Sequence, residues 1–186
     1  MRKPYIIGIA GGTCSGKSTT TDRLVKRLNT YLKAVLIMDN YFKRPGITTI
    51  APITGIEYVE HNHPDAMDLD RLYADFEAAC KSTAQIVFVE GLFALRLPEI
   101  REKLDLKIFV DLKSDARLVR RVQRFMSFGQ TLEEITDRYI DTVRFRHDEL
   151  IEPTRWHADI VLNGTLDDHK GLDVVENYIR AQLEKE

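Results

Sequence analysis

The feature of this sequence that most constrains its fold is the segment GGTCSGKS at Gly11–Ser18, which matches G-x-x-x-x-G-K-[ST] in full. A short apolar, β-branched run at Tyr5–Ala10 precedes it, and a helical pattern follows. The glycines permit a tight turn whose N–H groups converge on phosphate oxygens, while the helix points its positive end at the same anion. The sequence therefore predicts a strand, a phosphate-binding loop (P-loop) and a helix.

The predicted ligand of this loop is a nucleoside triphosphate with Mg²⁺. Lys17 adds a mobile charge for the β- and γ-phosphates, and the Ser18 hydroxyl suits the metal ion. The residues expected to bind the nucleotide are Gly11, Gly12, Thr13, Cys14, Ser15, Gly16, Lys17, Ser18 and Thr19. Switches, motors and kinases all use such a loop, so it names no reaction by itself. The sequence contains neither N-K-x-D nor LSGGQ, which disfavours a regulatory GTPase and a transporter ATPase.

Four further apolar runs resemble the first and alternate with helical patterns. They are Ala34–Met38, Gln85–Val89, Lys107–Val110 and Asp159–Leu162. Helical spacing places Leu72 and Phe76 on one face, Leu118, Val122 and Phe125 on another, and Val175 and Ile179 on a third. Thr131-x-x-Glu134 is a capping box that would open one more helix. Five strands alternating with helices predict an α/β fold of the P-loop NTPase type, with a parallel sheet covered on both faces.

The 186 residues fit one domain, and no shift in composition divides residues 1–186. A helical lid is expected at about residues 115–150. Residues 45–64 carry prolines, glycines and threonines without a sustained period, so we interpret them as a functional or mobile loop.

The balance of charge and the two cysteines narrow the setting of the protein. The net charge of −2 argues against a nucleic-acid partner held by bulk charge, and no apolar run approaches the ~18–20 residues of a membrane span. The N-terminus lacks the features of a signal peptide. Cys14 and Cys80 form no C-x-x-C pair, which fits a reducing, cytoplasmic location.

Two of the later predicted strands end in an acidic residue, the second in Asp39 and the third in Glu90. Ligands of doubly wound sheets bind beyond the carboxyl ends of the strands. Each acid is either a solvated strand terminator or a functional group facing the γ-phosphate, and the P-loop favours the second interpretation. Asp39 would then accept a proton from an attacking hydroxyl, and Glu90 would hold Mg²⁺.

Four arginines recur at helical spacing at Arg117, Arg120, Arg121 and Arg124. They share one helix face and repel one another unless an anion or an acidic partner lies opposite. One interpretation is a solvated basic face, and the other is a lid that closes over the triphosphate and stabilises its developing charge.

These segments together resemble the uridine kinase and phosphoribulokinase family of P-loop kinases. The matching stretches are GIAGGTCSGKST, MDNYFK, HNHPDAMD, VFVEG, IFVDLKSDARLVRRVQR and YIDTVR…IEPTRWHADIVLNG. The resemblance implies ATP and Mg²⁺ as cofactors, a small-molecule acceptor and often a homo-oligomer. It implies catalytic roles for Asp39 as general base and for Lys17, Arg121 and Arg124 at the phosphates. It also implies a metal site at Ser18 and Glu90, and acceptor contacts at Tyr41, Asn62, His63 and Arg121.

Three departures from the family pattern concern the acceptor. Asn62 stands where uridine kinases carry an aspartate that binds the ribose. Phe128-Gly129-Gln130 replaces an R-G-R run of the lid. The family also inserts a β-hairpin that grips the pyrimidine, where this chain has only residues 81–84.

Three functions remain open on the sequence. The first is phosphorylation of a primary hydroxyl, above all the 5′-OH of a pyrimidine ribonucleoside such as uridine or cytidine. The second keeps the chemistry and changes the acceptor to nicotinamide riboside, a pentose or sugar phosphate, or a pantothenate-like alcohol. The third is a nucleotide-binding ATPase switch, against which Asp39 argues because a switch needs no base aimed at an organic hydroxyl.

Overall fold

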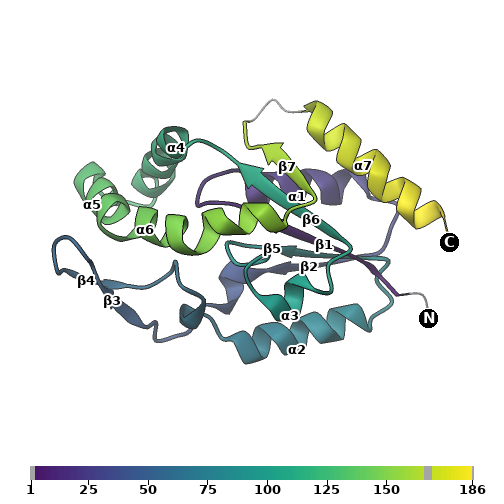
Figure 1. Ribbon diagram of the computed structural model, residues 1–186, viewed down its shortest axis with the longest axis horizontal. Coiled ribbons are helices and arrows are strands. Elements are labelled where there is room, and N and C mark those ends of the chain that lie inside the picture. The colour runs from purple at the N-terminus through teal and green to yellow at the C-terminus, as the bar shows by residue number, and fades with distance from the viewer. Residues whose placement is uncertain (1–2, 166–168, 186) are drawn as a thin grey trace.

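A computed structural model describes residues 3–165 and 169–185. Its centre is a five-stranded parallel sheet with the strand order β2-β5-β1-β6-β7 (Figure 1). The strands are β1 (Tyr5–Ala10), β2 (Lys33–Ile37), β5 (Ile86–Glu90), β6 (Leu106–Asp111) and β7 (Ile160–Asn163). The predicted α/β fold is confirmed, and each strand begins within one residue of its predicted start because short apolar runs mark strands that are buried on both faces.

Helices cover both faces of the sheet, as Figure 1 shows. On one face lie α1 (Lys17–Arg27) and α7 (His169–Glu184), and on the other α2 (Leu69–Cys80) and α3 (Pro98–Arg101). Alternate strand residues face the two layers, so Ile7 packs with the α1 and α7 residues and Ile6 with those of α2 and α3. No described helix is both long enough and apolar enough to cross a membrane.

A second group of helices stands beyond the carboxyl ends of the strands, where the lid was expected. It consists of α4 (Ser114–Met126), α5 (Leu132–Arg138) and α6 (Arg144–Arg146). Two π-helical turns flank α6, at Tyr139–Val143 and His147–Ile151, and a 3-10 turn follows at Glu152–His157. The predicted capping box is present, because the Thr131 side chain accepts from Glu134 N–H while the Glu134 carboxylate accepts from Thr131 N–H.

The α4 helix turns its arginines inward. Arg117 and Arg121 are its buried residues, at 4% and 6% exposure, whereas Val119 is 57% exposed. The interpretation of this stripe as a solvated basic face is therefore wrong for these two residues. Helical spacing predicts that the arginines share one face. It does not predict that this face is buried, because apolar residues are normally the buried ones.

Residues 45–64, expected to form an irregular loop, contain an antiparallel hairpin of β3 (Thr48–Ile50) and β4 (Glu57–Val59). Short 3-10 turns precede and follow it at Met38–Tyr41 and Pro64–Ala66. The hairpin lies beside α5 and α6 at the end of the molecule away from both termini (Figure 1). Between α2 and β5, where the family hairpin is missing from the sequence, the chain runs from residue 81 to 85 without a strand.

Two buried acids join the hairpin to the helical segment. Asp141, 2% exposed, accepts hydrogen bonds from the backbone N–H and the hydroxyl of Thr54 at the hairpin tip. Glu60, 3% exposed, pairs with Arg146, whose Nε lies 3.1 Å from Oε2. The hairpin and the helices therefore share fixed contacts rather than lying apart.

Replacing Asp141 with Asn tests this connection. The amide keeps the size of the side chain but loses the charge and one acceptor, so the hairpin tip should open more often. We expect hydrogen exchange of the amides in residues 48–59 to become about tenfold faster or more. The exposed residue Asp148 supplies the control variant Asp148→Asn, and equal exchange in both variants would contradict the proposed tether.

Candidate active site

The P-loop has the backbone geometry that its glycines predict. Gly11 and Gly16 adopt φ values of +144° and +109°, in the region that favours glycine. A Cβ atom on Gly11 would lie 2.3 Å from the Val110 carbonyl oxygen, which excludes any side chain there. Helix α1 begins directly after Gly16, at Lys17, so its unpaired N–H groups face the space enclosed by the loop.

Lys17 and Glu90 form the charged centre of the site. The Lys17 ammonium donates to the Gly12 carbonyl at 3.1 Å, and the Ser18 hydroxyl donates to Glu90 Oε1 at 3.3 Å. Burial lowers the pKa of Lys17 and raises the pKa of Glu90, and in each case the charge of the other opposes the shift. The negative charge of Asp39 also raises both pKa values, and the register of β2 with β5 brings Asp39 to the same end of the sheet as Glu90.

Asp39 itself lies in the 3-10 turn that follows β2 and is exposed. Glu90 is the last residue of β5 and is 5% exposed. Because β2 and β5 are neighbours in parallel register, their carboxyl ends bring the two acids to the same edge of the sheet. One acid is thus buried beside the lysine, and the other is open to a second molecule.

The oxygen atoms of Ser18 and Glu90 fit a magnesium ion. They are hard donors that already approach each other at the N-terminus of α1. Among residues 3–165 and 169–185, no group of three or more His, Cys, Asp and Glu side chains gathers into a cage for a metal. An ion at this place would therefore take most of its ligands from water and phosphate, as Mg²⁺ does in phosphoryl-transfer sites.

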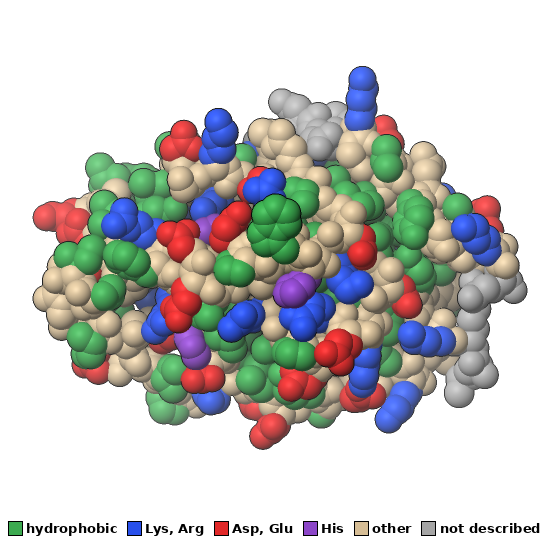
Figure 2. Space-filling model, viewed as in Figure 1, with side chains coloured by type: hydrophobic (Ala, Val, Ile, Leu, Met, Phe, Trp, Pro, Cys, Tyr) green, Lys and Arg blue, Asp and Glu red, His purple; other side chains and the backbone are tan. Residues whose placement is uncertain are grey.

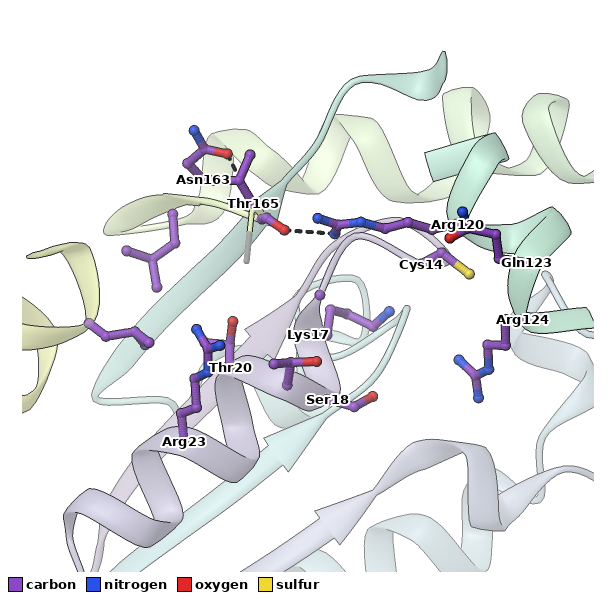
Figure 3. A pocket seen from close by; sticks show the side chains of 15 residues that line it. Cys14, Lys17, Ser18, Thr20, Arg23, Arg120, Gln123, Arg124, Asn163 and Thr165 are labelled. Atoms are coloured by element: carbon purple, nitrogen blue, oxygen red, sulfur yellow. Dashed lines mark hydrogen bonds between the residues drawn. The ribbon is translucent and has the colours of Figure 1, made fainter. Parts of the chain in front are cut away.

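The α4 arginines reach the P-loop from the opposite side. Arg121 Nη1 donates to the Thr13 hydroxyl at 3.2 Å, and its guanidinium stacks 4.3 Å above the Phe125 ring. Arg120 Nη1 donates to the Gly164 carbonyl at 2.7 Å. Arg124 points toward Lys17 and Ser18 across the cavity (Figure 3). This helix therefore brings positive charge to the P-loop and its cavity.

Arg117 and His147 form the wall behind Gly12. A Cβ on Gly12 would meet Arg117 Nη1 at 2.5 Å and His147 Cε1 at 2.9 Å. Arg117 Nε donates to the Leu112 carbonyl, but Arg117 Nη1 and His147 Nδ1 are buried without a hydrogen-bond partner. His147 Nε2 lies 3.3 Å from Glu152, whose charge water screens because that side chain is 44% exposed.

A cavity of about 470 Å³ opens beside the P-loop and extends toward β7 (Figure 3). Besides the loop and α4, its lining includes Arg23, Leu162, Asn163, Thr165 and Leu172. Arg120 spans this cavity to Gly164, and the Asn163 side chain accepts from Thr165 N–H. Its volume and its mixed apolar and polar walls suit the nucleoside part of a nucleotide.

The structure does not bring all predicted acceptor residues to this centre. Tyr41 is 7% exposed within the core, and its hydroxyl donates to Asp75 on α2 at 2.9 Å. His63 caps the turn at Pro64–Ala66, since its side chain accepts from Asp65 N–H. The backbone N–H of Asn62 donates to Glu60 at 2.6 Å.

Sequence reasoning missed several residues of the site. Asn163 and Thr165 follow the last strand, so the rule that ligands bind beyond carboxyl ends could have found them. The sequence placed Arg117 and Arg120 on the arginine face of a helix, but it predicted no contact for either of them. No motif marks His147, which reaches Gly12 through the fold alone.

The site combines a P-loop and buried cations, which can hold phosphates, with the exposed carboxylate of Asp39. This combination suits phosphoryl transfer to a small molecule. The chain is a P-loop small-molecule kinase. The sequence model described as "Phosphoribulokinase / Uridine kinase family" matches residues 77–168. A uridine kinase of Staphylococcus epidermidis is 32% identical over 209 aligned positions that cover the whole of both chains. The chain belongs to this family.

Solved structures agree with the fold. Phosphoribulokinase from Rhodobacter spheroides superposes with a TM-score of 0.61 at 17% identity, covering 86% of this chain and 69% of that one. Shikimate kinase from Acinetobacter baumannii reaches 0.53 at 15% identity, covering 98% and 95%. The uridine kinase alignment runs over 209 positions against 186 residues here, so that relative has residues without a counterpart in this chain.

The buried histidine makes stability depend on pH. Burial, with the charges of Arg117 and Lys17, lowers the pKa of His147 from 6.5 to about 4. Between these values the unfolded chain binds a proton that the folded protein excludes, so stability is lost as the pH falls from 6.5 to 4. The loss from this residue is up to about 3 kcal/mol.

His147→Gln removes this titration and keeps every carboxylate. We expect the wild-type protein to lose more stability than the variant when urea unfolding is compared at about pH 7.5 and about pH 4.5. An equal loss of stability in the two proteins would show that folding does not lower the pKa of His147.

Proposed function

We propose that this kinase transfers the γ-phosphoryl group of ATP to the 5′-hydroxyl of a pyrimidine ribonucleoside, uridine or cytidine. The observation that carries the proposal is the exposed carboxylate of Asp39 beside the buried Lys17–Glu90 pair. An acid there is accessible to an organic hydroxyl and close to the phosphate-binding lysine. The relatives at about 30% identity, named uridine kinases, favour a nucleoside as the acceptor.

In the proposed reaction, Asp39 accepts the proton of the attacking hydroxyl and orients its oxygen toward the phosphorus. Lys17 and the P-loop N–H groups hold the phosphates and stabilise the charge that spreads over their oxygens. Ser18 and Glu90 would hold Mg²⁺, which when bound would supply positive charge to the phosphates.

Helix α4 supplies the remaining positive charge and excludes water. Arg121 already donates to the P-loop through Thr13, and Arg124 faces Lys17 across the cavity. With the helical segment 114–151 acting as a lid over the triphosphate, transfer to water is suppressed in favour of the acceptor. We expect the enzyme to act in the cytoplasm, and its family resemblance favours a homo-oligomer.

A second acceptor class follows from one observation. Residues 81–85 join α2 to β5 without the hairpin that grips pyrimidines in uridine kinases. A site that lacks this element could take another primary alcohol, such as nicotinamide riboside, a pentose phosphate or a pantothenate-like alcohol.

An acceptor panel tests the proposal. ADP release from ATP and Mg²⁺ should rise with uridine or cytidine and stay low with nicotinamide riboside, pantothenate and pentose phosphates. Stimulation by one of the latter alone would replace the pyrimidine nucleoside with that acceptor. ATP turnover that no acceptor stimulates would overturn the proposed transfer reaction.

Asp39→Asn tests the base. The amide cannot accept the hydroxyl proton, so kcat should fall by about 100-fold or more. The Kd for ATP should stay close to that of the wild type, because Asp39 lies outside the P-loop. The matched control is Asp70→Asn, at an exposed acid in the first turn of α2. Near-normal turnover of Asp39→Asn would remove this residue from the base role.

A further inference from the structure

The 3-10 turn that follows β2 both presents the proposed base and anchors it. Residues three apart lie on one side of such a turn, so Met38 and Tyr41 face the core, while Asp39 and Asn40 between them face solvent. Met38 is 1% exposed and Tyr41 is 7% exposed, and both belong to the core on the α2 side of the sheet. The position of Asp39 therefore depends on what these two side chains contact.

Met38 rests on Gly91, the residue that follows Glu90. A Cβ atom on Gly91 would lie 2.5 Å from Met38 Cβ and 2.7 Å from Met38 Sδ, closer than van der Waals contact allows. The Gly91 N–H also donates to the Ile9 carbonyl at 3.1 Å, which holds this end of β5 against β1. The turn that carries Asp39 thus approaches the backbone directly beside Glu90, at a place that leaves no room for a side chain.

Tyr41, at the other end of the turn, is held by helix α2. Its hydroxyl donates to Asp75 Oδ2 at 2.9 Å, and the guanidinium of Arg71 lies 4.8 Å from the centroid of its ring. Burial and the hydrogen bond to Asp75 raise the pKa of Tyr41 to about 12, so the hydroxyl remains a donor at neutral pH. The Tyr41 carbonyl accepts from the N–H of Asp68, the N-cap of α2, at 2.7 Å. The turn is therefore attached to β5 at one end and to α2 at the other.

We propose that Tyr41 and Gly91 are positioning residues that act through Asp39. They fix the backbone of Asp39 relative to the Lys17–Glu90 pair, so that its carboxylate is in place before the acceptor arrives. This inference rests on the proposed function, in which Asp39 is the base. The attacking hydroxyl must lie within hydrogen-bond reach of the base, and a displacement of about 1 Å can cost about 100-fold in rate.

Tyr41→Phe removes the hydroxyl that binds Asp75 and keeps the ring. We expect the single-turnover rate of phosphoryl transfer from ATP to uridine to fall by about threefold to tenfold, while the Kd for ATP stays close to that of the wild type. Asp75→Asn keeps an acceptor oxygen for the hydroxyl and should retain most of the rate, whereas Asp75→Ala should match Tyr41→Phe. Gly91→Ala should lower the rate by up to about 100-fold, because the added Cβ displaces Met38.

The decisive comparison repeats Tyr41→Phe in the Asp39→Asn background. A residue that acts through the base loses its effect once the base is absent, so the rate of the double variant should equal that of Asp39→Asn alone. A merely structural change would lower the rate by the same factor in both backgrounds, and that outcome would overturn the inference.

Tyr73→Phe is the matched control, because it removes an equivalent hydrogen bond on the same helix, from the Tyr73 hydroxyl to Glu99 Oε2 at 3.1 Å. It should keep the wild-type rate. The Kd for ADP reports whether each variant is folded, and Asp75→Ala, at an exposed residue, decides the question if the core variants do not fold. Wild-type rates in folded Tyr41→Phe and Asp75→Ala would also overturn the inference. A wild-type enzyme that leaves uridine unphosphorylated would instead overturn the proposed function.

Discussion

Positive charge buried around the P-loop is the constraint on which the rest of this structure depends. Lys17, Arg117 and Arg121 are each less than 9% exposed, and Glu90 is the buried acid among them. Removing these cations from water is costly unless an anion replaces the lost hydration. A bound triphosphate would supply that anion, which accounts for an arginine face that packs inward although it would be unfavourable in an ordinary core. On the outer face seen in Figure 2, acidic and basic side chains are instead interspersed.

The same constraint separates the roles of the two acids. Glu90 ends a central strand, and its burial raises its pKa, so it depends on Lys17 or a metal ion to stay charged. Asp39 lies in the turn after the neighbouring edge strand, two residues beyond its last paired residue Ile37, and remains in contact with water. Two carboxylates that lie close together in different environments can hold a cation and accept a proton, respectively.

The sequence predicted those parts of the fold that depend on residues close together in the chain. Short apolar runs located all five sheet strands, and the spacing of the P-loop and of Thr131 and Glu134 predicted their turns. The β3–β4 hairpin escaped prediction because each strand has only three residues and its apolar ends, Ile50 and Val59, are exposed, while Thr49 and Tyr58 are half-buried. The direction of Tyr41 could not be predicted either, since its partner Asp75 lies 34 residues further along the chain.

The two halves of the site are therefore built by different means. Phosphate binding uses backbone turns at Gly11 and Gly16 and buried charges, which leave little freedom for change. Beyond it, a hairpin and a helical segment meet through the side chains of Thr54, Asp141, Glu60 and Arg146. Such a contact can change without disturbing the sheet, because these four side chains belong to neither of the two cores. The hairpin and the helical segment can thus vary while the phosphate-binding loop stays the same.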